Sequence, residues 1–392
     1  MRYSPARLVI STCSVALLGT VGVAQGQLPD SAANLLYKAL EQRINYDGVG
    51  MCVALSGGGM RATAFHAGVL RTLDDLPKHL PGGRSLALDG IDVLAAVSGG
   101  SLTAALYTLT PRGSWDSSGV SQLRDFLRSN PIQQTMTDYV LGWAFTRNVK
   151  NRIRYFEDVV HRNLLRQATF GQLPKSPHLV IVTKNFRNGR DVRFTQLTMR
   201  DHPNFFLAKA VAASGAIPVI FNPMTIDKIL VHSDIPDLDP QVRGELTPLF
   251  DGGVHDNLAV DPLLVLATDR PGRQRLCDIV FLSDATEIEF DKEIAQLDTE
   301  FSVVWRTLGL LMARIVSLQS VVIGGMGVLK DRAFVIKMPA RFNQIAATRD
   351  LGADEITELI EAGQQSAVAV IGDGSSLTDQ INLIRRSKRW RR

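Results

Sequence analysis

The stretch Ile91-Asp92-Val93-Leu94-Ala95-Ala96-Val97-Ser98-Gly99-Gly100 decides the fold class of this 392-residue chain. An apolar run ends at Ser98, two glycines follow, and an apolar helical pattern begins after them. The pattern predicts a strand, a sharp turn and a helix. A serine on such a turn holds its Oγ away from the backbone and over a helix N-terminus, so Ser98 is the first candidate nucleophile. The usual pattern is Gly-x-Ser-x-Gly, and here Ala96 occupies the first glycine position.

A second unit of the same kind lies upstream, where Ser56-Gly57-Gly58-Gly59-Met60-Arg61 separates an apolar run from a helical pattern. Consecutive glycines let backbone N–H groups gather around an anion, and the helix N-terminus adds positive potential. The loop lacks the Lys-Ser/Thr ending of a Walker loop and the Gly-x-Gly-x-x-Gly spacing of a dinucleotide site. We therefore expect an oxyanion site, with Arg61 supplying charge or anchoring the loop.

The third candidate segment is Phe250-Asp251-Gly252-Gly253-Val254-His255-Asp256-Asn257. The apolar residues before it indicate a short strand that ends at Asp251. A serine hydroxyl needs a base within hydrogen-bond reach, and Asp251 is able to be that base directly. Seen alone, Asp-Gly-Gly is also typical of a tight structural turn.

Together and in this order, the three segments resemble the patatin-like phospholipase family, whose relatives include the cytosolic phospholipase A enzymes. A fourth segment, Ala210-Val211-Ala212-Ala213-Ser214-Gly215-Ala216-Ile217-Pro218, resembles the family's small-residue segment that ends in Ile-Pro. The resemblance covers roughly residues 51–257. It implies a dyad in which Ser98 accepts the acyl group and Asp251 is the general base. It also implies an oxyanion site of Gly57, Gly58, Gly59 and Arg61, with Gly99, Gly100, Gly252, Gly253 and His255 beside the site.

The resemblance implies a single three-layer α/β domain with a mainly parallel central sheet and helices on both faces, expected over residues 27–375. The alternation of short apolar runs with helical patterns agrees with this architecture. Residues 110–177 are expected to form a helical cover and residues 226–249 a surface loop. The charge-free run 315–329 favours a buried helix and turn over a lipid-facing lid. We expect strands at 51–55, 91–97, 179–183, 192–197, 279–282 and 333–338, and helices at 31–43, 62–73, 205–213, 292–322 and 354–371, with one more after Ser98.

Both ends of the chain carry signals of their own. Arg2 and Arg7 precede a charge-free run, and Ala24-Gln25-Gly26 places small residues at a cleavage site, which predicts a secretory signal over residues 1–26. The protein is then secreted or periplasmic; a single membrane anchor is the alternative. Residues 376–392 end in a basic run that suits anionic surfaces, although a solvated, disordered tail is the preferred interpretation. The three cysteines, Cys13, Cys52 and Cys277, show no metal-ligand spacing and predict no disulfide framework.

Composition places the chain among ordinary globular proteins, with 45% hydrophobic and 21% charged residues and a net charge of +4. Nothing in it is arranged for nucleic acid. We expect a lipid acyl hydrolase that cleaves carboxylic esters of phospholipids or related lipids at a membrane surface, with no cofactor and no metal. Three alternatives remain open: an esterase with His255 as base, a lipid-binding scaffold without catalysis, and a nucleotide site in the glycine loop.

Overall fold

The computed structural model describes residues 49–76, 90–146, 151–187, 189, 191–218, 220–226, 247–269, 275–286, 307, 309–312, 314–319, 329, 332–372 and 374–390. The predicted signal at 1–26 and the helix expected at 31–43 lie outside these residues. So do most of the predicted loop at 226–249, most of the helix expected at 292–322 and most of the run 315–329.

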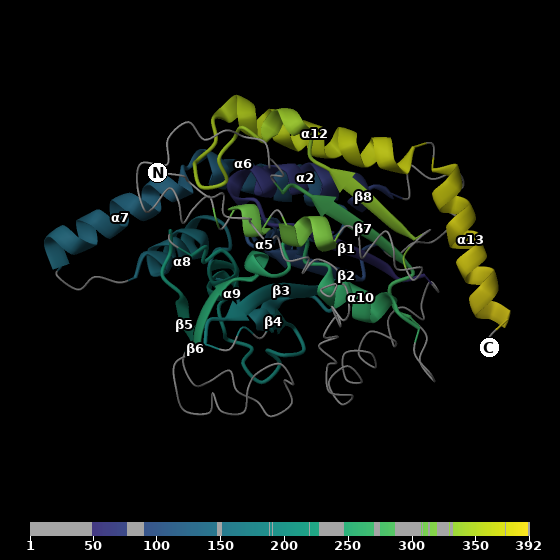
Figure 1. Ribbon diagram of the computed structural model, residues 1–392, viewed down its shortest axis with the longest axis horizontal. Coiled ribbons are helices and arrows are strands. Elements are labelled where there is room, and N and C mark those ends of the chain that lie inside the picture. The colour runs from purple at the N-terminus through teal and green to yellow at the C-terminus, as the bar shows by residue number, and fades with distance from the viewer. Residues whose placement is uncertain are drawn as a thin grey trace, which may run out of the picture.

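The described residues form an eight-stranded sheet in the order β5-β6-β3-β2-β1-β7-β8, with β4 paired to β3 (Figure 1). β1 pairs in parallel with β2 and β7, as do β2 with β3 and β7 with β8. The pairs of β3 with β4, β3 with β6 and β5 with β6 are antiparallel. The strands are β1 (Met51–Leu55), β2 (Val93–Val97), β3 (His178–Asn185), β4 (Asp191–Thr195), β5 (Met224–Ile226), β6 (Thr247–Asp251), β7 (Ile279–Asp284) and β8 (Ala333–Lys337).

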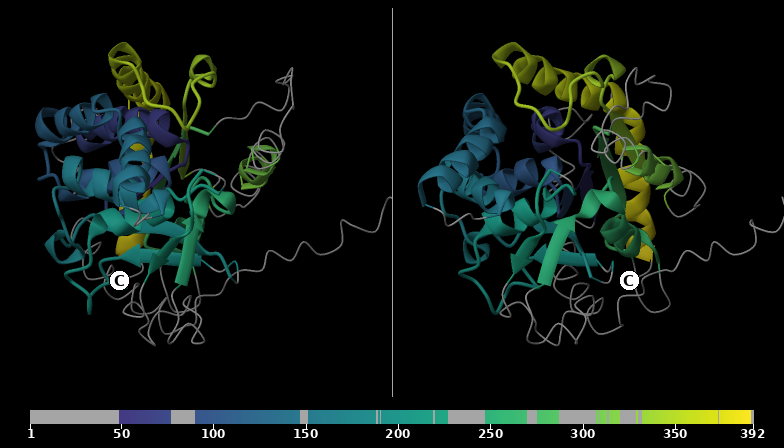
Figure 2. Two further views of the ribbon diagram at one scale, coloured as in Figure 1. Left: turned by 90° about the vertical axis from the view of Figure 1, so that its left-hand side faces the viewer. Right: turned by 60° about the vertical axis from the view of Figure 1, so that its left-hand side comes forward.

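Helices cover both faces of this sheet (Figure 2). Alternate residues of a strand point to opposite faces, so Val53 and Leu55 join one core while Cys52 and Ala54 join another. The larger core includes residues of α2, α5 and α12, and the smaller core includes residues of α10. The expected single α/β domain with a mostly parallel sheet is therefore confirmed. The helices are α2 (Gly59–Asp74), α5 (Gly99–Leu109), α6 (Val120–Arg128), α7 (Pro131–Thr146), α8 (Arg152–Asn163), α9 (Leu207–Ser214), α10 (Asp261–Ala267), α12 (Ala353–Ile371) and α13 (Ser375–Trp390).

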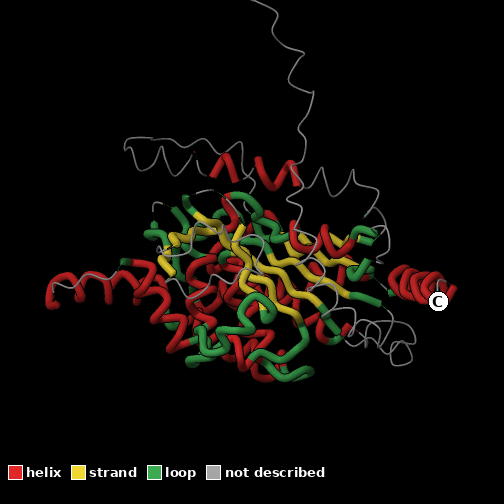
Figure 3. Tube along the Cα trace, turned by 90° about the horizontal axis from the view of Figure 1, so that it is seen from below, coloured by secondary structure: helices red, strands yellow, loops and turns green. Residues whose placement is uncertain are grey.

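The stretch 110–177, where we expected a helical cover, contains α6, α7 and α8. α7 extends away from the body of the molecule (Figure 3). Within the described residues, every strand expected from the sequence is present, and β5 is an additional one of three residues.

The expectation of a disordered C-terminal tail is wrong as far as Trp390. Residues Ser375–Trp390 form α13. Leu377, Ile381 and Ile384 are buried and belong to the larger core. Their spacing of four and three residues places them on one face of a helix, so burial of that face stabilises the segment despite its basic end. Within the described part of the chain, no helix is long and apolar enough to span a membrane.

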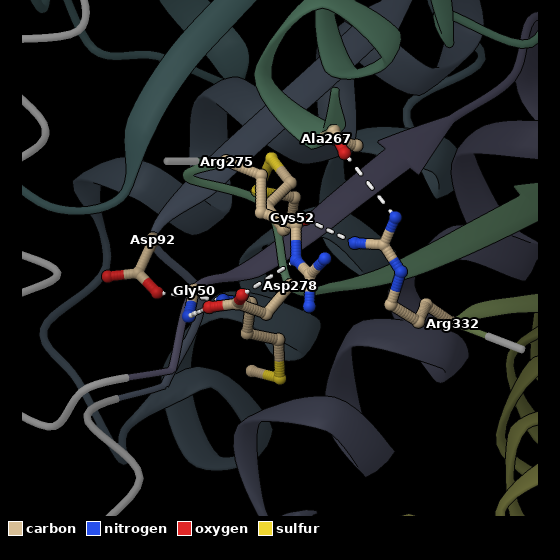
Figure 4. The surroundings of a disulfide bond; sticks show 9 residues. Gly50, Cys52, Asp92, Ala267, Arg275, Asp278 and Arg332 are labelled. Atoms are coloured by element: carbon tan, nitrogen blue, oxygen red, sulfur yellow. Dashed lines mark hydrogen bonds and ion pairs between the residues drawn. A yellow bond between two sulfur atoms is a disulfide. The ribbon is translucent and has the colours of Figure 1, made fainter. Parts of the chain in front are cut away.

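A disulfide joins Cys52 of β1 to Cys277, which precedes β7 (Figure 4). The sequence predicted no disulfide framework, so this bond corrects that expectation. β1 and β7 are neighbours in the sheet, so the two cysteines meet although 225 positions separate them. Beside the bond, Asp278 accepts hydrogen bonds from the Gly50 amide at 2.8 Å and from Arg275 Nε at 3.2 Å.

Candidate active site

The predicted sharp turn is present at Ser98, between β2 and α5. Ser98 has φ 51° and ψ −127°, and only 5% of the residue is exposed. A positive φ is unfavourable for a side chain with a Cβ, and such strain is typical of functional sites. Ala96, which replaces the usual glycine, lies inside β2, where it pairs with Leu55 and Ile181. The extra methyl group is thus accommodated in extended backbone before the turn begins.

Gly99 and Gly100 allow the first turn of α5 to pack directly on the glycine loop. A Cβ on Gly99 would lie 2.2 Å from the carbonyl oxygen of Gly59, and one on Gly100 would lie 2.6 Å from that of Ser56. Real side chains do not tolerate such distances. This close approach brings the N-termini of α5 and α2 together next to Ser98. Both helix termini carry partial positive charge, so the position favours an anion.

Strand pairing places Asp251 beside Ser98. β2 runs parallel to β3 and its last pair is Val97 with Val182. β6 runs antiparallel to β3 and its last pair is Asp251 with Thr183, the next residue along β3. The two strands therefore lie on either side of β3 and end at adjacent positions along it, and the side chains of Ser98 and Asp251 interact across this edge. Ser98 follows the end of one strand, and Asp251 is the end of the other.

The carboxyl group of Asp251 is buried and has a pKa raised to about 7. Burial is the main cause; interactions with the Ser98 side chain and with the Gly253 amide oppose it. The Gly253 amide donates to Oδ1 at 2.7 Å. Within the described residues, Oδ2 has no well-formed hydrogen bond, yet the Ser98 hydroxyl is close enough to the carboxyl group to lower its pKa. A carboxylate that is half protonated near neutral pH is suited to accept a proton.

The glycine loop lies directly against Ser98, because a Cβ on Gly57 would lie 3.2 Å from Ser98 Cβ. The Gly57 amide donates to the carbonyl oxygen of Asn257 at 2.9 Å. Gly58 and Gly59 have φ values of 137° and 65°, which favour glycine. Of the three predicted oxyanion donors, the Gly57 amide is thus already hydrogen-bonded, and the amides of Gly58 and Gly59 remain the candidates.

Arg61 contacts the segment that follows β8. The side chain is buried, and Nη1 donates to the carbonyl oxygens of Asn343 at 3.1 Å and Ile345 at 3.0 Å. A Cβ on Gly59 would lie 1.7 Å from the carbonyl oxygen of Ala347, so the same segment packs on the glycine loop. Of the two roles expected for Arg61, these contacts support anchoring rather than supplying charge to an oxyanion.

His66, which the sequence did not single out, holds the start of the glycine loop. Its Nε2 lies 2.9 Å from the Ser56 carbonyl oxygen, and its Nδ1 lies 2.7 Å from Ser283 Oγ. Burial lowers its pKa to about 4, so the ring is neutral at pH 7. A carbonyl oxygen only accepts, so we infer that Nε2 carries the proton and that Nδ1 accepts from the Ser283 hydroxyl.

Ser214 and Asn257 also support the site, although sequence analysis gave neither a role. Ser214 Oγ accepts from the Ser98 amide at 2.9 Å and donates to the Val182 carbonyl oxygen at 2.7 Å. Ser214 belongs to the small-residue segment, in which nothing marks it out from its neighbours. The buried Asn257 side chain fills the space beside Gly57 and Gly253, where a Cβ would come within 2.5 Å of Oδ1.

A pocket opens beside Ser98, and its walls are mostly apolar. A hydrocarbon chain suits such walls, since burial removes its surface from water. The lining residues are Gly59, Met60, Ser98, Gly99, Leu102, Ile132, Phe156, Val211, Gly215, Ile217, Ile220, Phe221, Ala347 and Thr348.

His255 follows Asp251 by four positions in the sequence, but its side chain lies near the carboxylate of Asp261. Its side chain is 57% exposed, and Nδ1 lies 3.9 Å from Asp261 Oδ2. These contacts give no support to His255 as the base. His255, Asp261 and Asp191 are the only group of described residues whose ligand atoms are close enough for a metal, within 4.8 Å. Asp191 already pairs with Lys184 and Arg193, which compete with a cation.

Residues 53–264 match the family model described as patatin-like phospholipase. The match spans more than half of the chain, so this protein belongs to the patatin-like phospholipase family.

Two solved structures are similar to this chain, and the first supports the fold. Human GIVD cytosolic phospholipase A2 is similar over 92% of this chain and 67% of its own, with a TM-score of 0.50 and 11% identity. VipD from Legionella pneumophila is similar over 82% of this chain and 66% of its own, with a TM-score of 0.38 and 12% identity. The chain thus spans about two thirds of the length of both structures. No curated protein matches the sequence.

Proposed function

We propose that this protein is a lipid acyl hydrolase that cleaves carboxylic esters of phospholipids or related lipids through a Ser98-Asp251 dyad and an acyl-enzyme. The observation that carries the proposal is the interaction of Ser98, on a strained turn after β2, with the buried Asp251 at the end of β6. Membership of the patatin-like phospholipase family supports the same substrate class.

In the acylation step, Ser98 Oγ forms a bond to the ester carbonyl carbon while Asp251 accepts the hydroxyl proton. The carbonyl oxygen becomes an oxyanion at the N-termini of α2 and α5, where the Gly58 and Gly59 amides are the proposed donors. Stabilisation of this kind is often the largest single contribution to catalysis; one donor is worth about 2.7 to 4 kcal/mol. The carbon–oxygen bond to the alcohol then breaks, and the alcohol takes the proton from Asp251.

Hydrolysis of the acyl-enzyme repeats these steps with water as the nucleophile. Asp251 accepts a proton from water as its oxygen bonds to the acyl carbon. Collapse of the second oxyanion breaks the bond to Ser98 Oγ, which recovers its proton from Asp251 and releases the fatty acid. The apolar pocket beside Ser98 is suited to hold the acyl chain through both steps.

Product analysis tests the function. Purified protein is incubated with mixed phospholipids and the products are identified by mass spectrometry, with Ser98→Ala as the matched variant. We expect free fatty acid and lysophospholipid from the wild type and neither from the variant. A folded wild-type protein that binds lipid but releases no acyl product would instead favour the scaffold alternative.

We also propose that the protein is exported. The predicted signal at residues 1–26 supports export, as does the bond between Cys52 and Cys277, because structural disulfides persist mainly in oxidising compartments. Sequencing the N-terminus of the mature protein tests this. We expect a start near residue 27, whereas an intact Met1 would favour the membrane-anchor alternative or retention in the cell.

A further inference from the structure

Three glycines line the apolar pocket beside Ser98, namely Gly59, Gly99 and Gly215. Close packing of the backbone explains two of them. A Cβ on Gly59 would lie 1.7 Å from the carbonyl oxygen of Ala347, and one on Gly99 would lie 2.2 Å from that of Gly59. Real Cβ atoms do not approach backbone atoms so closely, so the fold alone requires glycine at both positions.

Gly215, which follows α9, differs because neither its backbone nor its neighbours require glycine. Its φ of −94° and ψ of 7° are values that residues with a side chain also adopt in turns. A Cβ at this position would lie 3.6 Å from Phe156 Cε1 and 3.6 Å from the Val211 carbonyl oxygen, which are ordinary van der Waals distances. Gly215, Phe156 and Val211 all line the pocket. The absence of a side chain at position 215 therefore leaves space in the pocket wall.

The chain on either side of Gly215 is fixed to both members of the proposed dyad. Ser214 Oγ accepts a hydrogen bond from the Ser98 amide at 2.9 Å. The Ala216 carbonyl oxygen accepts one from the Asp251 amide at 3.1 Å. Gly215 lies between these two anchoring residues, so it belongs to the part of the wall that an acyl chain attached to Ser98 would contact.

The wall that faces Gly215 is aromatic and well packed. Phe156 of α8 is buried, and its ring centroid lies 5.4 Å from that of Phe221, which also lines the pocket. A buried ring that packs on a second ring loses those contacts when it is displaced. A side chain larger than that of alanine at position 215 would therefore occupy space in the pocket instead of pushing Phe156 aside.

We propose that Gly215 determines the length of the acyl chain that the site accepts. The open wall at this position admits a long chain, and a side chain here restricts the site to short acyl groups. This inference rests on the proposed function, because it assigns the pocket beside Ser98 to the acyl part of the substrate. An acetyl group has a single methyl beyond its carbonyl and contacts little of the wall, whereas a decanoyl chain has to lie along it.

Hydrolysis of p-nitrophenyl acetate and p-nitrophenyl decanoate tests the proposal. The measured quantity is the ratio of kcat/KM for decanoate to kcat/KM for acetate, which does not depend on the fraction of folded protein. We expect Gly215→Val to lower this ratio by about tenfold or more, and Gly215→Ala to lower it by less.

Gly309→Val is the matched control for the hydrolysis experiment. Gly309 is exposed, a Cβ there would meet nothing within 4 Å, and it does not line the pocket. The control is expected to keep the wild-type ratio. An unchanged ratio in Gly215→Val, or an equal fall in Gly309→Val, would overturn the proposal.

A second substitution separates blockage of the pocket from damage to the fold. Phe156→Leu makes the facing wall smaller, so the double variant Gly215→Val/Phe156→Leu is expected to recover several-fold of the lost ratio. Damage to the fold at position 215 would instead be made worse by a further change in the core. A double variant that is folded and shows no recovery would contradict the assignment.

Binding of decanoate gives a readout that needs no catalysis. In the Ser98→Ala background, isothermal titration calorimetry is expected to show binding by the parent, about tenfold weaker binding by Gly215→Val, and parental binding by Gly309→Val. If the wild type hydrolyses neither ester, the proposed function fails, while calorimetry still decides the role of Gly215. Equal binding by the parent and Gly215→Val, or no binding by the parent, would overturn the inference.

Discussion

Ser98 follows β2 and Asp251 ends β6, two strands that flank β3 and end at adjacent positions along it, where Val97 pairs with Val182 and Asp251 pairs with Thr183. Backbone hydrogen bonds of the sheet therefore fix the nucleophile candidate relative to the base candidate. The proposed dyad, held in this way, would need no third residue to orient a mobile imidazole, as a Ser-His-Asp triad does.

The pH dependence of activity should follow Asp251. Its pKa of about 7 means that the carboxylate form, which accepts the proton, is lost as the pH falls below neutral. We expect kcat/KM for a soluble ester to rise with pH, with a midpoint near pH 7. His255→Gln is the control, and it should keep the same midpoint. If kcat/KM of that variant no longer falls below neutral pH, the histidine is the base instead.

Replacement of Asp251 should stabilise the fold above neutral pH. The folded-state pKa is raised from 3.8 to about 7, so the wild type loses stability as the pH rises through this window and the buried carboxyl ionises. Asp251→Asn avoids this loss. We expect its melting temperature to exceed that of the wild type by about 3 to 6 °C at pH 8 and to match it near pH 4.

The exposed Asp125 supplies the control for this measurement, because Asp125→Asn should leave the melting temperature within a degree or so of the wild type at both pH values. If the difference in melting temperature between Asp251→Asn and the wild type stays the same from pH 4 to pH 8, ionisation of Asp251 is not its cause.

Ser214 should act as a positioning residue for Ser98. Ser214→Ala removes the acceptor of the Ser98 amide and the donor to the Val182 carbonyl, and each buried unpaired group costs about 1 to 3 kcal/mol. We expect kcat to fall about tenfold to a hundredfold with little change in KM, and labelling of Ser98 by a fluorophosphonate to slow in parallel. Thr108→Ala removes a buried hydroxyl that bonds within its own helix and should leave kcat unchanged. A raised KM with unaltered kcat would refute the positioning role.

The disulfide should contribute to stability in oxidising conditions. It closes a long loop in the unfolded chain, which stabilises the folded state by about 2 to 5 kcal/mol. We expect a reductant to lower the melting temperature of the wild type and to leave that of Cys52→Ala/Cys277→Ala unchanged. Equal responses of the two proteins would show that the bond is absent or without effect.

Sequence patterns predicted the parts of this fold that depend on neighbouring residues. The run before Ser98 indicated a strand, the glycines after it indicated a tight turn, and β2 and α5 follow that pattern. Asp251 was found in the same way, at the end of a short apolar run. The burial of Leu377, Ile381 and Ile384 follows a helical spacing that the prediction did not use, because the basic residues after them favoured a disordered tail.

Contacts between distant segments were not predictable from the sequence. Arg61 bonds to carbonyl groups at Asn343 and Ile345, more than 280 positions away. Ser214 and the Cys52–Cys277 bond likewise depend on which elements the sheet brings together. Local patterns contain no information about such pairing, because it is decided by the packing of the whole domain.

The central claim is that Ser98 is the nucleophile of an acyl hydrolase. Incubation with a fluorophosphonate probe, followed by mass spectrometry of the peptides, tests it most directly. The account predicts one adduct, on Ser98, in the folded protein, with no labelling and no ester hydrolysis in Ser98→Ala. An adduct on another residue, or hydrolysis that persists in a folded Ser98→Ala protein, would contradict it.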